Sequence, residues 1–167
     1  MIYVIGNGPS LQKTDLNKLI GHKTYAVNRI WKIWEDNPSI LWRPTDYVRG
    51  ELPAYNEEMV IEDLQKMSAL DCTMHLQAGF WKFKERWWNG VADVEYFDSC
   101  NGDDPHDWHL PNLCGYGTVV NIAVQIAVLD GADEIRLLGC DLGLPNHFYG
   151  VEGTNKDNLP VSAHEIA

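Results

Sequence analysis

The sequence lacks several features that would place it in familiar classes. It has only four cysteines among 167 residues, at positions 72, 100, 114 and 140, with no CxxC pair. Widely spaced thiols of this kind indicate a reduced, cytoplasmic protein rather than a disulfide framework. No apolar run approaches the roughly 20 residues that a membrane span needs. The opening segment, Met1–Asn7, has no basic region and no cleavage site, so it predicts a strand rather than a signal peptide.

Positive charge is also scarce. Thirteen Lys and Arg face 24 Asp and Glu, which gives a formal net charge of −11. This balance argues against binding to nucleic acid or to an anionic membrane surface, because both need clustered positive charge. A small anionic ligand held by one local loop stays compatible with it. A hydrophobic content of 45% and an aromatic content of 11% exclude a disordered chain.

The length fits one domain, and there is no repeat, linker or low-complexity tract, so we expect residues 1–167 to form a single domain. Residues 162–167 resemble the first turn of a helix with Ser162 as its N-cap. The chain therefore either ends in a one-turn helix or stops short of a full domain.

Apolar patterns alternate between strand-like and helical periods along the chain. Strands are expected at residues 2–5, 24–27, 72–76, 91–97 and 135–138, and helices at 11–20, 57–70 and 118–129. Residues 40–42 and 47–48 predict one broken strand or two, divided by Pro44. The strand at 135–138 is expected to be buried. This alternation predicts an α/β fold, a single Rossmann-like domain with a mainly parallel sheet flanked by helices.

The loop after the first strand is the strongest candidate for ligand binding. Gly6, Asn7, Gly8 and Ser10 form a turn that can expose backbone amides, and Pro9 suits the first turn of a following helix. Amides at a helix N-terminus attract phosphate. The loop matches neither GxGxxG nor the Walker A pattern. It predicts either a phosphate-binding loop or a tight turn without a ligand.

Two further loops follow predicted strands, where open parallel sheets bind ligands. Asn28 predicts a contact to ribose or base, or else a surface turn. Asp141 predicts a base, a ribose ligand or a metal ligand, or else a carboxylate that orders its loop by accepting backbone N–H groups. Behind it, His147 and Tyr149 either bind a phosphate or sugar or pack within the loop.

Other clusters are weaker. Residues 103–109 hold HxxH and three carboxylates, but an acidic, solvated loop is favoured over a metal site, and no metal is predicted. Residues 81–88 interleave basic and aromatic side chains, which favours packing on the sheet or a sugar-stacking platform. We expect His22 and His75 to be structural.

In this order, the loops resemble the bacterial lipooligosaccharide sialyltransferases (glycosyltransferase family 42). They also resemble the wider domain shared by motility-accessory flagellin glycosyltransferases and archaeal pterin diphosphokinases. The matching segments are Val4–Leu11, Asn28, Gly115–Thr118, Gly139–Asp141 and Phe148–Gly150. An arginine that the sialyltransferases carry before the helix is missing from Pro111–Gly115. A tyrosine that they carry after the last strand is missing from Asp141–Gly143.

The resemblance implies an inverting glycosyltransferase that takes a cytidine-monophosphate (CMP) sugar and a glycan or similar acceptor, without cofactor or metal. It implies catalytic roles for His164 as general base and for Tyr149 at the departing phosphate, and we add Asp141 as a catalytic candidate because it follows a predicted strand. The substrate-binding residues that we predict are Gly6, Asn7, Gly8, Ser10, Asn28, Gly117, Thr118 and His147. Whether the protein forms an oligomer stays open.

Two other functions stay open at this point. One is a Mg²⁺-dependent diphosphokinase of the pterin type, with the metal held by carboxylates such as Asp141 or Asp46. The other is a non-catalytic nucleotide-binding fragment of a larger enzyme. A dehydrogenase is disfavoured, because Asn28 and Arg29 stand where an acidic residue would bind the ribose.

Overall fold

A computed structural model describes residues 1–50, 57–100, 112–114 and 118–141. The strands are β1 (Ile2–Ile5), β2 (Thr24–Val27), β3 (Asp46–Arg49), β4 (Thr73–Gln77), β5 (Asp93–Cys100), β6 (Asn112–Cys114) and β7 (Ile135–Leu138). The α-helices are α1 (Lys32–Asp36), α2 (Glu57–Ser68), α3 (Lys84–Trp87) and α4 (Val119–Leu129). Short 3₁₀ helices are η1 (Pro9–Lys13), η2 (Leu16–Leu19) and η3 (Ala78–Phe83). Within these residues, no helix has the length and apolar character to cross a membrane.

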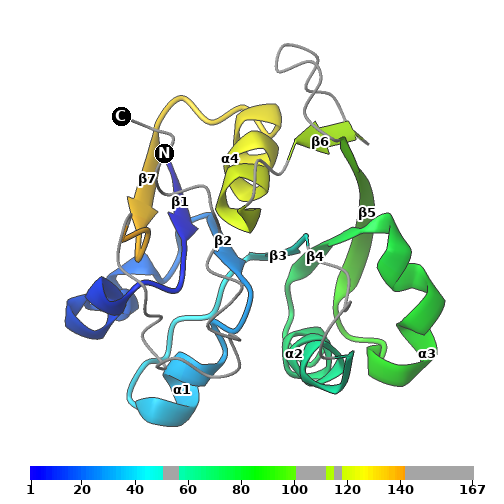
Figure 1. Cartoon of the computed structure of the whole chain (residues 1–167). Coiled ribbons are helices and arrows are strands. Elements are labelled where there is room, and N and C mark those ends of the chain that lie inside the picture. The colour runs from blue at the N-terminus through cyan, green and yellow to red at the C-terminus, as the bar shows by residue number, and fades with distance from the viewer. Residues whose placement is uncertain (51–56, 101–111, 115–117, 142–167) are drawn as a thin grey trace, which may run out of the picture.

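The strands form one sheet in the order β6-β5-β4-β3-β2-β1-β7, and every neighbouring pair is parallel. The chain runs outward from β1 to β6 and then returns through α4 to β7, on the other side of β1 (Figure 1). The α/β, Rossmann-like fold class predicted from the alternating pattern is therefore confirmed. The strand order reverses between β1 and β7, which makes their carboxyl ends the switch point of the sheet.

Helices cover both faces of the sheet because β1 and β2 are apolar on both sides. On one face α4 packs against Ile2, Val4, Tyr25, Val27, Val48 and Phe97. On the other face Ile5, Ala26, Tyr47, Met74 and Leu76 pack against residues of η1, η2, α1 and α2. The nearly all-apolar sequence of α4 fits this buried position. Thr118 caps it by accepting from the Val120 amide, and Gly131 follows with φ +81°.

Two of the predicted elements differ from the structure. Residues 11–20 form not one helix but η1 and η2, divided at Thr14 and Asp15. Residues 40–42 are not a strand, because the Asn17 side chain accepts the amides of Leu41 and Trp42 and holds them outside the sheet. The elements α1, η3, α3 and β6 were not predicted.

The strand β7 was expected to be buried, and this expectation is wrong. Ile135 and Leu138 are half-buried, and Leu137 is 53% exposed. β7 stands at one end of the strand order and, in the described part of the chain, pairs with β1 alone. An apolar strand sequence predicts membership of the sheet but does not distinguish an edge strand from a central one.

His75 is buried in an ionic network on the face covered by α4, in agreement with the structural role expected of it. Its Nε2 lies 2.9 Å from Asp46 Oδ1 and its Nδ1 lies 3.2 Å from Glu95 Oε2. Lys23 Nζ lies 2.7 Å from Asp46 Oδ2, as an ion pair rather than an aligned hydrogen bond. Burial opposes ionisation of Asp46, but its contacts with His75, Lys23 and Thr45 hold its pKa below the ordinary value. The network ties β2, β3, β4 and β5 together.

This network predicts a pH-dependent loss of stability in Asp46→Asn. A carboxylate whose folded pKa lies below its unfolded value of about 3.9 stabilises the fold above that pH, and the contribution disappears as the pH falls through the folded pKa. We expect Asp46→Asn to lower the free energy of unfolding by about 3–5 kcal/mol near neutral pH, since it breaks a buried ion pair. The loss should shrink on acidification toward roughly pH 2.

Urea unfolding of wild type and variant at the two pH values measures this. Asp71→Asn, at an exposed position before β4, is the control and should change stability by less than about 0.5 kcal/mol. An Asp46→Asn loss that is equal at both pH values would contradict the assignment.

Candidate functional site

The loops after β1 and β7 meet at the switch point of the sheet. Ile5 pairs with Leu138, so Gly6 and Gly139, which follow them, lie side by side. The Gly6 amide donates to the Leu138 carbonyl at 2.8 Å, and the Gly8 amide donates to the Gly139 carbonyl at 2.6 Å. These bonds continue the β1–β7 pairing beyond the strands and hold the two loops together.

Glycine is required in both loops because nothing larger fits between them. A Cβ on Gly6 would lie 2.5 Å from the Gly139 carbonyl oxygen, and one on Gly8 would lie 2.2 Å from Asp141 Oδ2. Gly139 itself has φ +62°, and a Cβ there would lie 2.5 Å from Leu11 Cγ. The absence of side chains at these glycines thus allows the two loops to pack against each other.

Asp141 orders the first loop. Its Oδ2 accepts the Ser10 amide at 2.7 Å, at the start of η1. This contact favours the loop-ordering role that the sequence left open. The amides of Gly6, Gly8 and Ser10 all donate to acceptors within the chain, so these three amides are not free to bind an anion.

Asn7 is anchored from within the sheet. It is 5% exposed, and its Nδ2 donates to the Val27 carbonyl at 3.0 Å, linking the loop after β1 to the end of β2. Its Oδ1 is buried and has no hydrogen-bond partner among the described residues. A buried amide oxygen left unpaired is uncommon, and it indicates that a donor group of a ligand or a water molecule pairs with it.

Asn28 comes directly after β2 and has φ +52°, a left-handed conformation that asparagine tolerates. Its Oδ1 accepts from Arg49 Nη1 at 3.2 Å, at the end of β3. Among the described residues its Nδ2 group has no acceptor. The structure therefore places Asn28 at the same edge of the sheet as Asn7, as the sequence predicted.

A set of buried charges that the sequence did not single out lies beside Asn28. Arg29 Nε and Trp31 Nε1 contact Asp63 Oδ1 at 3.1 Å and 2.7 Å, and Arg49 Nη1 lies 3.2 Å from Asp63 Oδ2. We call Arg29, Arg49 and Asp63 the arginine cluster. Burial raises the pKa of Asp63, and Arg49, Trp31 and Arg29 act in the opposite direction. The sequence signal was an arginine at the end of each of two neighbouring strands: Arg29 lies two residues after β2, and Arg49 is the last residue of β3.

The amino end of α4 reaches the same edge. A Cβ on Gly50, the residue after β3, would lie 2.7 Å from Ile122 Cδ1 and 3.5 Å from Val119 Cγ2. Thr118, predicted as a substrate-binding residue, is the exposed N-cap of α4. The partial positive charge of a helix N-terminus therefore lies close to the ends of β2 and β3.

Four of the predicted site residues, Gly117, His147, Tyr149 and His164, lie outside the described residues, as does the acidic segment 103–109. Of the aromatic segment 81–88, Trp87 is buried, whereas Trp81 is 62% exposed.

The two carboxylates considered for Mg²⁺ do not come together. Asp46 opens β3 at the amino edge of the sheet, and Asp141 follows β7 at the carboxyl edge. Asp46 is paired with Lys23 and His75, and Asp141 accepts the Ser10 amide. These two groups do not form a shared metal site.

A pocket of about 220 Å³ lies between η1, η2 and α1, lined among others by Asp15, Asn17 and Asn37. Asn17 accepts the amides of Leu41 and Trp42, and Asn37 accepts the Ser39 amide. None of the predicted site residues lines it, so the conserved geometry of parallel sheets favours the carboxyl edge as the site.

Comparisons with known proteins support the fold. Searches of protein-family models and of curated proteins gave no match. The solved structure of the MAf glycosyltransferase from Magnetospirillum magneticum AMB-1 aligns with a TM-score of 0.59 at 17% sequence identity. The alignment covers 87% of this chain and 23% of that protein. At this identity the likeness shows a shared fold, and the chain spans about a quarter of its structural neighbour.

The close approach of Gly8 and Asp141 gives a testable prediction. Gly8 has φ −69° and ψ 157°, which any residue adopts, so Gly8→Ala should be unfavourable only through the collision with Asp141 and Gly139. We expect a loss of about 1–3 kcal/mol in unfolding free energy. Asp141→Ala should lose about 1 kcal/mol with the Ser10 hydrogen bond.

The double variant Gly8→Ala/Asp141→Ala should lose less than the sum of the two, because removing the carboxylate makes room for the methyl group. Chemical unfolding of the four proteins gives the coupling energy. Strict additivity would mean that the two residues are not in contact.

Proposed function

We propose that this chain is a nucleotide-binding domain of a glycosyltransferase, and that the phosphate of a nucleotide-sugar donor binds at the carboxyl edge of the sheet. The observation that carries the proposal is the meeting of the loops after β1, β2 and β7 at the switch point. There Asn7 has an unpaired buried acceptor and Asn28 has an amide group directed to no acceptor in the described part of the chain. Open α/β sheets bind ligands in this position.

The fold shared with the MAf glycosyltransferase supports a glycosyl-transfer reaction over the other reactions that this sheet can host. The sequence resemblance to the sialyltransferases supports a CMP-sugar as the donor. A fold alone does not determine an activity, so the donor is what the experiment must identify.

In the inverting reaction, a hydroxyl of the acceptor forms a bond to the anomeric carbon from the face opposite the donor phosphate. The bond from that carbon to the phosphate oxygen breaks, and CMP leaves with the electron pair. The acceptor proton passes to a general base, which the resemblance assigns to His164, and Tyr149 donates to the departing phosphate. Donors fixed at the position where charge develops are the main source of rate enhancement in such a step.

A thermal-shift titration with CMP, UDP, ATP and NAD, each with and without Mg²⁺, tests the proposal. A ligand at a hundredfold excess over its Kd stabilises the native state by about 2.7 kcal/mol, which a melting curve resolves. We expect CMP to stabilise the protein without Mg²⁺. Stabilisation only by ATP with Mg²⁺ would support a diphosphokinase instead, and no shift with any nucleotide would overturn nucleotide binding.

Asn28→Gly is the variant that tests the site. Glycine keeps the left-handed backbone at this position and removes only the amide side chain. We expect the Kd for CMP to rise about tenfold, as for the loss of a hydrogen bond to a charged group.

The control is Asn89→Ala, an exposed residue before β5 at the amino edge of the sheet, which should leave CMP affinity within about twofold. Equal CMP affinity of wild type and Asn28→Gly, measured by calorimetry, would remove Asn28 from the site.

A further inference from the structure

The arginine cluster buries two guanidinium groups beside one buried carboxylate, near the ends of β2 and β3. Arg29 and Arg49 are 8% and 4% exposed, and they share the fully buried carboxylate of Asp63. A second carboxylate, Glu62, lies 3.5 Å from Arg29 Nη2, but its side chain is half-exposed and its charge is screened by water. In the described part of the chain, Asp63 is the only carboxylate that forms an ion pair with Arg49.

Hydrogen bonding in this cluster is incomplete. Among the described residues, Arg49 Nε is buried without an aligned hydrogen-bond acceptor. Buried polar groups are nearly always paired, and exceptions gather where a ligand, ion or water completes the arrangement. The unpaired Arg49 Nε therefore marks a place where an acceptor is needed.

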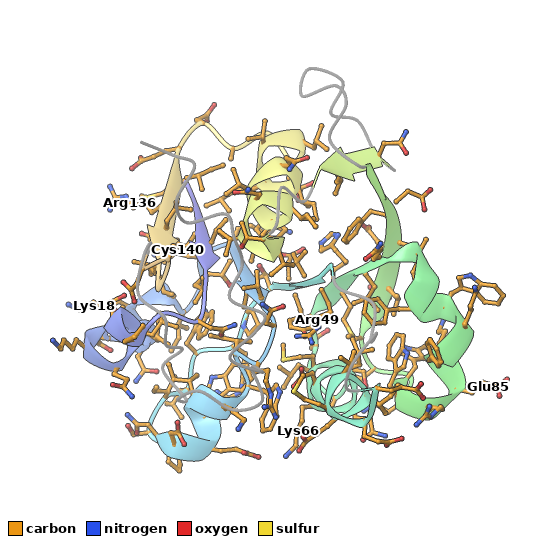
Figure 2. All side chains as sticks on the ribbon, in the orientation of Figure 1. Lys18, Arg49, Lys66, Glu85, Arg136 and Cys140 are labelled. Atoms are coloured by element: carbon orange, nitrogen blue, oxygen red, sulfur yellow. The ribbon has the colours of Figure 1, made fainter. Side chains whose placement is uncertain are left out.

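Arg49 is also held in a defined direction. Asn28 accepts from its Nη1, and Asp63 lies against the same nitrogen. Figure 2 shows Arg49 near the centre of the molecule, beside α2. A guanidinium group held in this way attracts an anion.

Resting on the function proposed above, we propose that Arg49 binds the phosphate of the nucleotide donor. The step that separates CMP from the sugar leaves negative charge on that phosphate, and a guanidinium fork stabilises it by two parallel hydrogen bonds. Arg29, which contacts Asp63 and Glu62, positions the carboxylate that orients Arg49.

Arg49→Gln should leave the fold intact, because Asp63 keeps its contacts with Arg29 and Trp31. The matched control is Arg136→Gln, which removes the same unit of charge from an exposed ion pair with Glu134 on β7. Calorimetry with CMP and with cytidine, which lacks the phosphate, should be done at one ionic strength, because charge contacts are screened by salt.

We expect Arg49→Gln to weaken CMP binding by about tenfold or more, and Arg136→Gln by less than about twofold. Cytidine affinity should be equal in all three proteins. If CMP binds to Arg49→Gln as to wild type, the inference is wrong while the proposed function stands.

Two further measurements distinguish a failure of the inference about Arg49 from a failure of the proposed function. If Arg49→Gln fails to fold, Arg49→Lys takes its place; it keeps the charge, loses the fork and should still weaken CMP binding several-fold. If wild type binds no nucleotide, the proposed function fails, and inorganic pyrophosphate is the probe. Pyrophosphate binding that is lost in Arg49→Gln would preserve an anion site at Arg49, and absence of pyrophosphate binding would overturn that site as well.

Discussion

The architecture depends on one steric constraint, which is that the loops after β1 and β7 occupy the same small space. A side chain at Gly6 or Gly8 would overlap the Gly139 carbonyl or the Asp141 carboxylate. Because the loops fit, Asp141 reaches the Ser10 amide and the β1–β7 pairing extends past the strands. The position of Asn7 follows, since its loop is fixed from the β7 side and its amide is tied to β2. The geometry of the whole carboxyl edge is set from this contact.

Two arginines are buried at this edge of a chain that is acidic as a whole. The chain carries a formal net charge of −11, yet two arginines lie buried around one aspartate at the ends of β2 and β3. Overall acidity repels polyanions at long range, where exposed charges act. A buried guanidinium acts at contact distance and is screened far less. An acidic protein can therefore combine selectivity against nucleic acid with affinity for a single small phosphate.

The apolar periodicity within single strands and helices predicted the fold well. Contacts between residues far apart in the sequence could not be predicted from it. The strands at residues 2–5, 24–27 and 135–138 match the structure, as does α4, because their apolar periods are strong. The wrong predictions were at residues whose structure depends on contacts with residues distant in the sequence. Asn17 draws residues 41 and 42 out of the sheet, and only the strand order makes β7 an edge. The places of Asn7 and Asn28 at the carboxyl edge were foreseeable from their positions after strands. The role proposed for Arg49 depends on Asp63, which the chain brings from α2.

The pairing of β1 with β7 also bears on the order in which the sheet assembles. Strands β1 to β5 pair with their neighbours in sequence, but β7 returns to Ile2 from Ile135, across most of the chain. Closing so long a loop carries a larger entropy loss than closing the short connections between consecutive strands. Pairings between residues far apart in sequence also form slowly. The edge that holds Gly139 and Asp141 is therefore expected to join last. The contact between the loops after β1 and β7 forms only when folding is nearly complete.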